Sequence, residues 1–177
     1  KDGLADRCRI VQAAGAALPF AGGGPGGPGG SGGFDAIYHS DVLCCLVEKL
    51  AVLQSCRRVI RKTGRMVFSV ILIAPGLSDS DYAVAADGGP TFIETGIAYS
   101  EMLEQSDWEI TDHTDQTADY FDTFRKMFEL EKANEDELIR LRGPEGSADL
   151  LAHREATLIS VDRGLLRREL FSVTPAG

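Results

Sequence analysis

The first half of the chain alternates short apolar runs with one segment of helical periodicity. The runs at residues 8–12, 34–38 and 66–73 predict β-strands. Over residues 46–60 apolar side chains recur at three- and four-residue steps, which predicts an amphipathic helix. We expect the basic residues between positions 57 and 62 to occupy the last turns of this helix and Gly64 to end it. The run at 66–73 is almost wholly apolar, as in a central parallel strand.

The second half continues the alternation with more polar elements. Apolar residues at helical spacing predict helices at residues 79–86, from about 99, at 117–132 and at 147–163, and strands are predicted at 108–112 and 166–174. Strands that alternate with helices predict an open α/β sheet with mainly parallel pairing. We expect one domain over residues 1–177.

A glycine-rich stretch interrupts this pattern at residues 21–33, with the sequence AGGGPGGPGGSGG. Its composition predicts a flexible linker inside the domain. The alternative is a cofactor loop, which would make the protein a nucleotide-binding α/β protein. A phosphate loop, however, needs glycines between a strand and a helix, whereas this stretch precedes a strand and contains two prolines.

Composition narrows the function classes. The formal net charge is −9 and the pI is about 4.8, so the field of the protein disfavours nucleic acid as a partner. The longest apolar run, residues 66–75, is far shorter than the ~20 residues of a membrane helix, so no membrane partner is expected. The four cysteines form neither a C-x-x-C motif nor a disulfide framework, so we expect no metal site and a cytoplasmic location.

Five segments, in this order, carry a resemblance to a known family. They are ALPF at 17–20, FDAIYHSDVL at 34–43, CRRVIRKTGRMVF at 56–68, the helix and W-E-I pattern at 99–112, and RRELFSV at 167–173. Together they resemble the C-terminal two thirds of a class I S-adenosylmethionine-dependent methyltransferase of the small-molecule type. The resemblance implies a truncated Rossmann-like sheet in three layers, mainly parallel with a final antiparallel strand.

The resemblance also implies S-adenosylmethionine as cofactor and names the residues near it. The family's acidic-Gly-x-Gly-x-Gly loop and ribose-binding acid do not occur before residue 8, and Ala14 stands where the family has an aspartate beside the adenine. The expected cofactor-binding residues are Ala14, Gly15, through its backbone amide, and Ser40. With the N-terminal cofactor half missing, we expect this chain alone to bind the cofactor weakly or not at all.

The loop after the strand at 34–38 lies at the junction of cofactor and acceptor in the resembling family. His39 is therefore a candidate base for a protonated acceptor, and Asp41 is a second catalytic candidate. The alternative is structural, with His39 at the strand end and Asp41 beginning the next turn. The Asn-Pro-Pro-Tyr signature of relatives that methylate nucleobases is absent at residues 40–43, which disfavours such acceptors.

Four aromatic residues are candidates for an acceptor pocket: Tyr82, Tyr99, Tyr120 and Phe124. Aromatic side chains at helical spacing also form cores, so this assignment has a structural alternative. Two functions are carried forward. The first is methyl transfer to a small-molecule acceptor by in-line displacement. The second is a non-catalytic, methyltransferase-like remnant that acts by self-association, as a homodimer through an exposed sheet edge, or with a partner chain.

Overall fold

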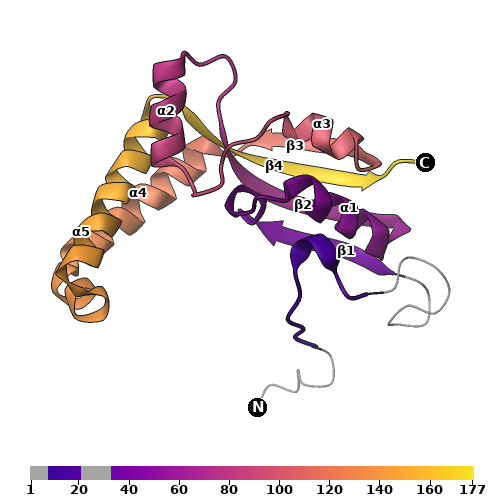
Figure 1. The fold of residues 1–177 in the computed structure, drawn as a ribbon, viewed down its shortest axis with the longest axis horizontal. Helices are drawn as coiled ribbons and strands as arrows, with labels where there is room; N and C mark the ends of the chain where they lie inside the picture. Colours follow the sequence, from indigo (N-terminus) through magenta and orange to yellow (C-terminus); the bar gives the residue numbers. More distant parts are fainter. Residues whose placement is uncertain (1–7, 21–32) are drawn as a thin grey trace.

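The computed structural model describes residues 8–20 and 33–177, which form a four-stranded sheet flanked by helices (Figure 1). The strands are β1 (Phe34–Ser40), β2 (Ile60–Ile73), β3 (Trp108–Asp115) and β4 (Leu166–Pro175), in the order β1-β2-β4-β3. β1 and β2 are parallel, whereas β4 is antiparallel to both of its neighbours. The α/β class, the open sheet and the final antiparallel strand are therefore confirmed.

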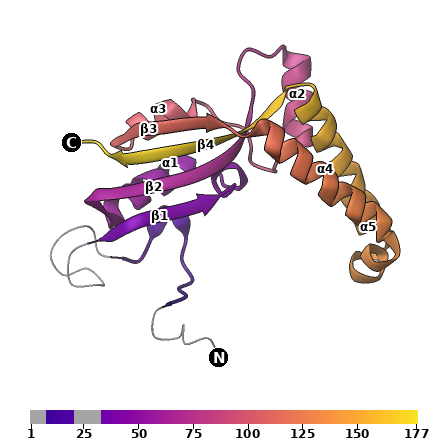
Figure 2. The same ribbon diagram turned by 180° about the vertical axis from the view of Figure 1, so that it is seen from behind.

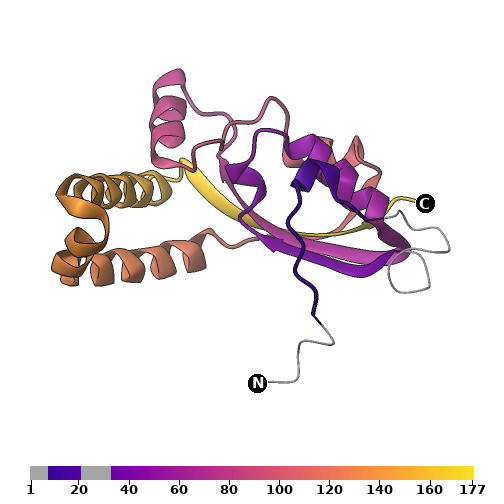
Figure 3. The same cartoon turned by 60° about the horizontal axis from the view of Figure 1, so that its bottom comes forward.

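Two helices, α1 (Lys49–Val59) and α3 (Tyr99–Glu104), cover one face of this sheet (Figure 3). Of the three layers predicted, the described residues supply this helical layer and the sheet. Helix α2 (Asp79–Gly88) packs against α5 (Glu135–Asp162), which runs beside α4 (Thr117–Ala133). The α4 and α5 pair extends from the end of the sheet (Figures 1 and 2).

Gly143, with a φ of 79°, interrupts helix α5 just before Pro144. None of the helices formed by residues 8–20 and 33–177 combines the length and apolar character needed to cross a bilayer.

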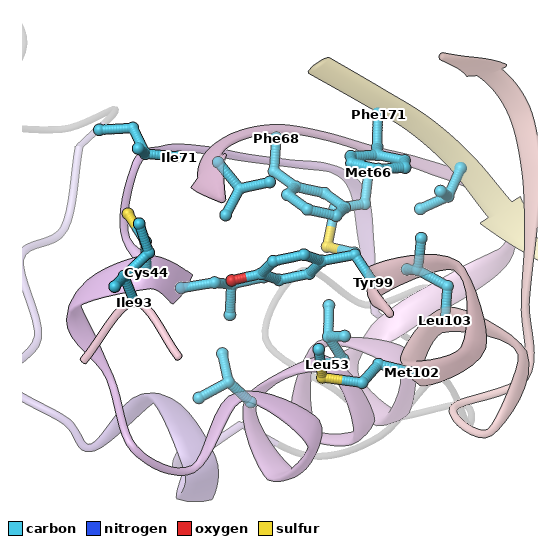
Figure 4. Close-up of a cluster of buried hydrophobic side chains, with 14 of the residues drawn as sticks. Cys44, Leu53, Met66, Phe68, Ile71, Ile93, Tyr99, Met102, Leu103 and Phe171 are labelled. Atoms are coloured by element: carbon cyan, nitrogen blue, oxygen red, sulfur yellow. The ribbon is translucent and has the colours of Figure 1, made fainter. Parts of the chain in front are cut away.

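The main core lies between the sheet and the layer formed by α1 and α3 (Figure 4). Phe68 of β2 and Leu53 of α1 are fully buried there. The indole of Trp108, at the start of β3, donates a hydrogen bond to the Leu53 carbonyl at 3.2 Å. Burial of this apolar face is the main force that holds α1 on the sheet.

The opposite face of the sheet is more exposed. Tyr38 of β1 projects from it with 73% of its surface accessible, and the outer edge of β1 pairs with no strand in the described part of the chain. The open face and this free edge are the least protected parts of the sheet.

The strand predicted at residues 8–12 is wrong. Residues 8–14 have no regular secondary structure, and Ile10 is 99% exposed. A short apolar run forms a strand only where a neighbour offers backbone groups and an apolar face, and this segment has neither. Nearly all of the linker predicted at 21–33 falls outside the described residues.

The predicted end of the first long helix is also wrong. Helix α1 ends at Val59 and strand β2 begins at Ile60, so Gly64 lies within the strand. A Cβ on Gly64 would be 2.6 Å from Ile60 Cγ1 and 3.0 Å from the Asp35 carbonyl oxygen. Gly64 is therefore explained by the close approach of β1 and β2, where their register shifts, and not by a helix end.

Candidate functional site

Strand β1 ends in a strained polar turn. Asp41, directly after Ser40, has a positive φ of 52°, and its backbone amide donates a 2.9 Å hydrogen bond to the Ser69 carbonyl of β2. A non-glycine residue in this region costs free energy and persists only where its surroundings fix it. Ligands of open α/β sheets bind at the carboxyl ends of parallel strands. The turn at Asp41 is thus a candidate site on two independent grounds.

Arg168 of β4 organises the side chains around this turn. We call Ser40, Asp41, Ser69, Gln116 and Arg168 the Arg168 cluster. The guanidinium Nε donates to both carboxylate oxygens of Asp41, at 3.0 and 3.1 Å. Nη2 donates to the hydroxyls of Ser69 at 2.9 Å and Ser40 at 3.1 Å, and Nη1 donates to the Gln116 side chain at 3.1 Å. One side chain therefore ties together β1, β2, β4 and the residue before α4.

The ion pair in this cluster is partly sheltered from water. The side chains of Arg168 and Asp41 are 21% and 30% exposed. Charge-assisted hydrogen bonds in such a setting are shorter and stronger than neutral ones, and they fix the orientation of both groups. The Ser69 hydroxyl donates a further bond to Asp41 at 3.0 Å. With its oxygens engaged in this way, the Asp41 carboxylate is held in one orientation between Arg168 and Ser69.

The first turns of α4 cover this cluster with two aromatic rings. The Tyr120 ring lies 5.9 Å from the Arg168 guanidinium carbon, and Phe124 packs against Tyr120 with ring centroids 5.4 Å apart. Burial, together with the negative charge of Asp41, raises the pKa of Tyr120 to about 12. The phenol therefore stays protonated at neutral pH and can donate a hydrogen bond.

His39 points to the opposite, helix-covered face of the sheet. Its ring stacks on Phe68 with centroids 5.0 Å apart, and both ring nitrogens are buried without a hydrogen-bond partner. Burial lowers the pKa of His39 to about 4 despite the nearby carboxylate of Asp41. The imidazole is neutral at physiological pH. A group with so low a pKa is a weak base, so the catalytic role of His39 stays a prediction without geometric support.

This low pKa predicts a pH-dependent stability. The folded-state pKa of about 4 lies below the usual histidine pKa of 6.5, so the unfolded chain takes up the proton first as the pH falls. We expect the free energy of unfolding to drop by about 2 kcal/mol more for the native protein than for His39→Phe between pH 7 and pH 4.5. Urea unfolding at the two pH values measures this difference. His153→Gln, at an exposed position of α5, should change with pH as the native protein does. Equal pH dependence in His39→Phe and the native protein would contradict the assignment.

Tyr82 and Tyr99 lie away from the Arg168 cluster. Both line a cavity of about 550 Å³ on the helix-covered side of the sheet. Tyr99 is 5% exposed, and its hydroxyl is buried without a partner among the core side chains drawn in Figure 4. The four predicted acceptor-binding aromatics therefore divide into two pairs on opposite sides of the sheet.

Ala14 and Gly15, the other predicted cofactor contacts, lie at the 3-10 turn η1 (Gly15–Ala17), which packs on α1. A Cβ on Gly15 would meet Val52 of α1 at 3.3 Å. No hydrogen bond joins either residue to Ser40 or Asp41 in the part of the chain that the structure describes. Their role toward a cofactor stays a prediction.

Three members of the cluster, Ser69, Gln116 and Arg168, were not among the predicted site residues. Signals for two of them exist in the sequence. The alternation in RRELFSV places Arg168, Leu170 and Ser172 on the face opposite Phe171. Ser69 likewise interrupts the apolar run of β2.

Within residues 8–20 and 33–177, no group of three or more His, Cys, Asp and Glu side chains is arranged to hold a metal ion.

Comparison with known proteins relates this fold to solved structures. No family model matches the chain, and no curated protein is similar to it in sequence. A protein assigned as a sarcosine dimethylglycine methyltransferase from Galdieria sulphuraria superposes with a TM-score of 0.84 at 16% identity, over 98% of this chain and 61% of that protein. The geranyl diphosphate C-methyltransferase of Streptomyces coelicolor superposes with a TM-score of 0.66 at 13% identity, over 97% of this chain and 54% of that enzyme.

These matches establish a methyltransferase-like, Rossmann-like fold. The cyclase SpnF also has it, with a TM-score of 0.71 at 17% identity over 99% of this chain and 58% of that protein. The chain thus spans between 54% and 61% of the length of these three proteins. Because a cyclase is among them, the fold alone does not select a reaction.

Proposed function

We propose that this chain serves S-adenosylmethionine-dependent methyl transfer to a small-molecule acceptor, with the Arg168 cluster as its acceptor-orienting site. The observation that carries the proposal is the superposition on the Galdieria protein over nearly the whole chain. The enzyme from Streptomyces coelicolor supports it further, since its structure holds S-adenosylhomocysteine, geranyl diphosphate and Mg²⁺. The strained polar turn of this chain lies where open α/β sheets bind their ligands.

The chemistry of the cluster agrees with this reaction. Methyl transfer from a sulfonium is an in-line displacement with a good leaving group, so the protein contributes mainly proximity and orientation. The groups at the turn are orienting groups: Arg168 is held by several acceptors, and Tyr120 remains protonated. None of them is placed as a strong base at neutral pH. We therefore expect the acceptor atom to be a nucleophile that carries no proton to be removed.

The described residues do not complete a cradle for the cofactor. Asp41, the acid at the end of β1, is engaged by Arg168, and within the described residues no glycine-rich loop joins a strand to a helix. We therefore derive no step through the cofactor. We propose that the remaining contacts come from polypeptide equivalent to the part of the Galdieria protein that the superposition leaves uncovered.

Calorimetric titration with S-adenosylhomocysteine tests the proposed division of the site, in which further polypeptide supplies the remaining cofactor contacts. The chain alone should show no saturable binding. A fusion that adds the uncovered part of the Galdieria protein should bind, and Arg168→Met in that fusion should weaken acceptor-dependent turnover more than cofactor binding. Low-micromolar binding by the chain alone would contradict the proposed division. A folded fusion that binds nothing would contradict the proposed function.

The free edge of β1 favours a second candidate function, association without catalysis. The edge strand is unpaired in the described residues, and Tyr38 is strongly exposed beside it. Unpaired edges can accept a strand from a second copy. Light scattering after size exclusion measures the mass directly. A monomer at concentrations of about 100 μM, well above the Kd of a stable dimer, would contradict this candidate.

A further inference from the structure

The cavity on the helix-covered side of the sheet is separate from the Arg168 cluster. It has a volume of about 550 Å³ and lies between the end of β2, the segment before α3, and strands β3 and β4. Two consecutive residues of β4 contribute to different sites: the Arg168 side chain belongs to the Arg168 cluster, whereas Glu169 lines the cavity. The sheet therefore separates the two sites.

Aromatic rings and one carboxylate define the chemistry of this cavity. The His113 ring stacks on Phe171 with centroids 4.2 Å apart, and Tyr82 and Tyr99 complete the aromatic wall. His113 Nε2 and Glu169 Oε2 are 2.8 Å apart. Neither lysine nor arginine is among the described residues that line the cavity, so Glu169 carries its only fixed charge.

The pair formed by His113 and Glu169 leaves the carboxylate accessible to a ligand. The Glu169 side chain is 15% exposed, and only its Oε2 has a hydrogen-bond partner in the described part of the chain. The stacking of His113 on Phe171 holds the imidazole in place, and its contact with Oε2 orients the carboxylate. Oε1 remains open to a donor from the cavity. A carboxylate in such a half-buried, apolar setting binds a cationic donor more strongly than it would in water.

We propose that this cavity binds a small hydrophobic ammonium compound, with the ammonium group on Glu169 and the apolar body along the rings and aliphatic wall. The volume lies within the usual ~300–1,000 Å³ range of small-molecule sites. The faces of Tyr82 and Tyr99, which line the cavity, attract a cation, which adds to the charge of Glu169. An anionic ligand is disfavoured because no lysine or arginine among the described lining residues is there to pair with it. The site is independent of the proposed methyl transfer.

Three probes with the same phenylpropyl skeleton test the proposal on the full chain: 3-phenylpropylamine, 3-phenylpropan-1-ol and 3-phenylpropionate. In calorimetric titrations the amine should bind about tenfold more tightly than the alcohol, and the carboxylate more weakly still. Glu169→Gln keeps the shape and removes the charge, so it should abolish the preference for the amine. Glu109→Gln makes the same charge change outside the cavity and should leave the preference intact.

Amide chemical shifts locate the bound probe. Titration with the amine should shift the backbone amides of Gly96, Ile97 and Phe171, which line the cavity, and should leave those of Ser40 and Asp41 in place. Equal affinity for amine and alcohol, no measurable binding of the amine, or shifts centred on the Arg168 cluster would each overturn the proposal. A preference for the amine that survives Glu169→Gln would overturn it as well.

Discussion

Replacing Phe68 with alanine is expected to lower the free energy of unfolding by about 4 kcal/mol, the largest effect of any single substitution considered. Phe68 is fully buried at the centre of β2. Its ring lies in a row that crosses the sheet, with the His39 centroid 5.0 Å away on one side and the Phe171 centroid 5.2 Å away on the other. Alanine would remove contacts to both rings and leave a cavity that the rigid sheet cannot close.

Urea unfolding measures this loss, and Tyr38→Ala is the matched control. Tyr38 lies next to His39 on β1 but on the open face, with 73% of its surface exposed, so its removal should cost less than about 1 kcal/mol. Should Phe68→Ala fail to fold, Phe68→Leu retains most of the volume and should lose about 1–2 kcal/mol. Equal losses for Phe68→Ala and Tyr38→Ala would show that the ring row is not part of the core.

The row of rings explains why the sheet could be predicted from local sequence. Phe68 belongs to an apolar run, and Phe171 to a segment in which apolar and polar residues alternate, so strands were predicted at 66–73 and 166–174. The ends of both strands agree closely with the structure, whereas β2 begins at Ile60, well before the predicted start. Residues 8–12 have a similar apolar pattern but form no strand, because none of the described strands pairs with them. The prediction that Gly64 ends the helix was wrong for the same reason. The packing of Gly64 against Asp35 is a contact between strands, which local periodicity does not contain.

The candidate site shows the same division between local and distant information. Ser40, Asp41 and Tyr120 were predicted, and the structure brings them together at the end of β1. Arg168 binds the first two, yet it comes from the last strand, far along the chain. A sequence reveals polar residues at a strand end. It does not reveal which distant cation satisfies them, because that depends on the order of strands in the sheet.

Replacing Arg168 with methionine should lower the free energy of unfolding by about 2–3 kcal/mol. Methionine retains much of the apolar stem but leaves the Asp41 carboxylate without its two guanidinium bonds. Since both side chains are less than one third exposed, water replaces those bonds only in part. The hydroxyls of Ser40 and Ser69 would lose the same donor, and the strained turn would lose its link to β4.

A double-mutant cycle separates the pair from its surroundings. In the Asp41→Asn background, Arg168→Met should cost about 1 kcal/mol less than in the native protein, because no charge is left unpaired. Arg140→Met removes an exposed i,i+3 partner of Glu137, with side chains 69% and 53% exposed, and should leave the free energy of unfolding nearly unchanged. If urea unfolding gives Arg168→Met a cost as small as that of Arg140→Met, the cluster does not hold the turn. Other contacts must then offset the backbone strain at Asp41. The orienting role proposed for Arg168 would lose its structural basis.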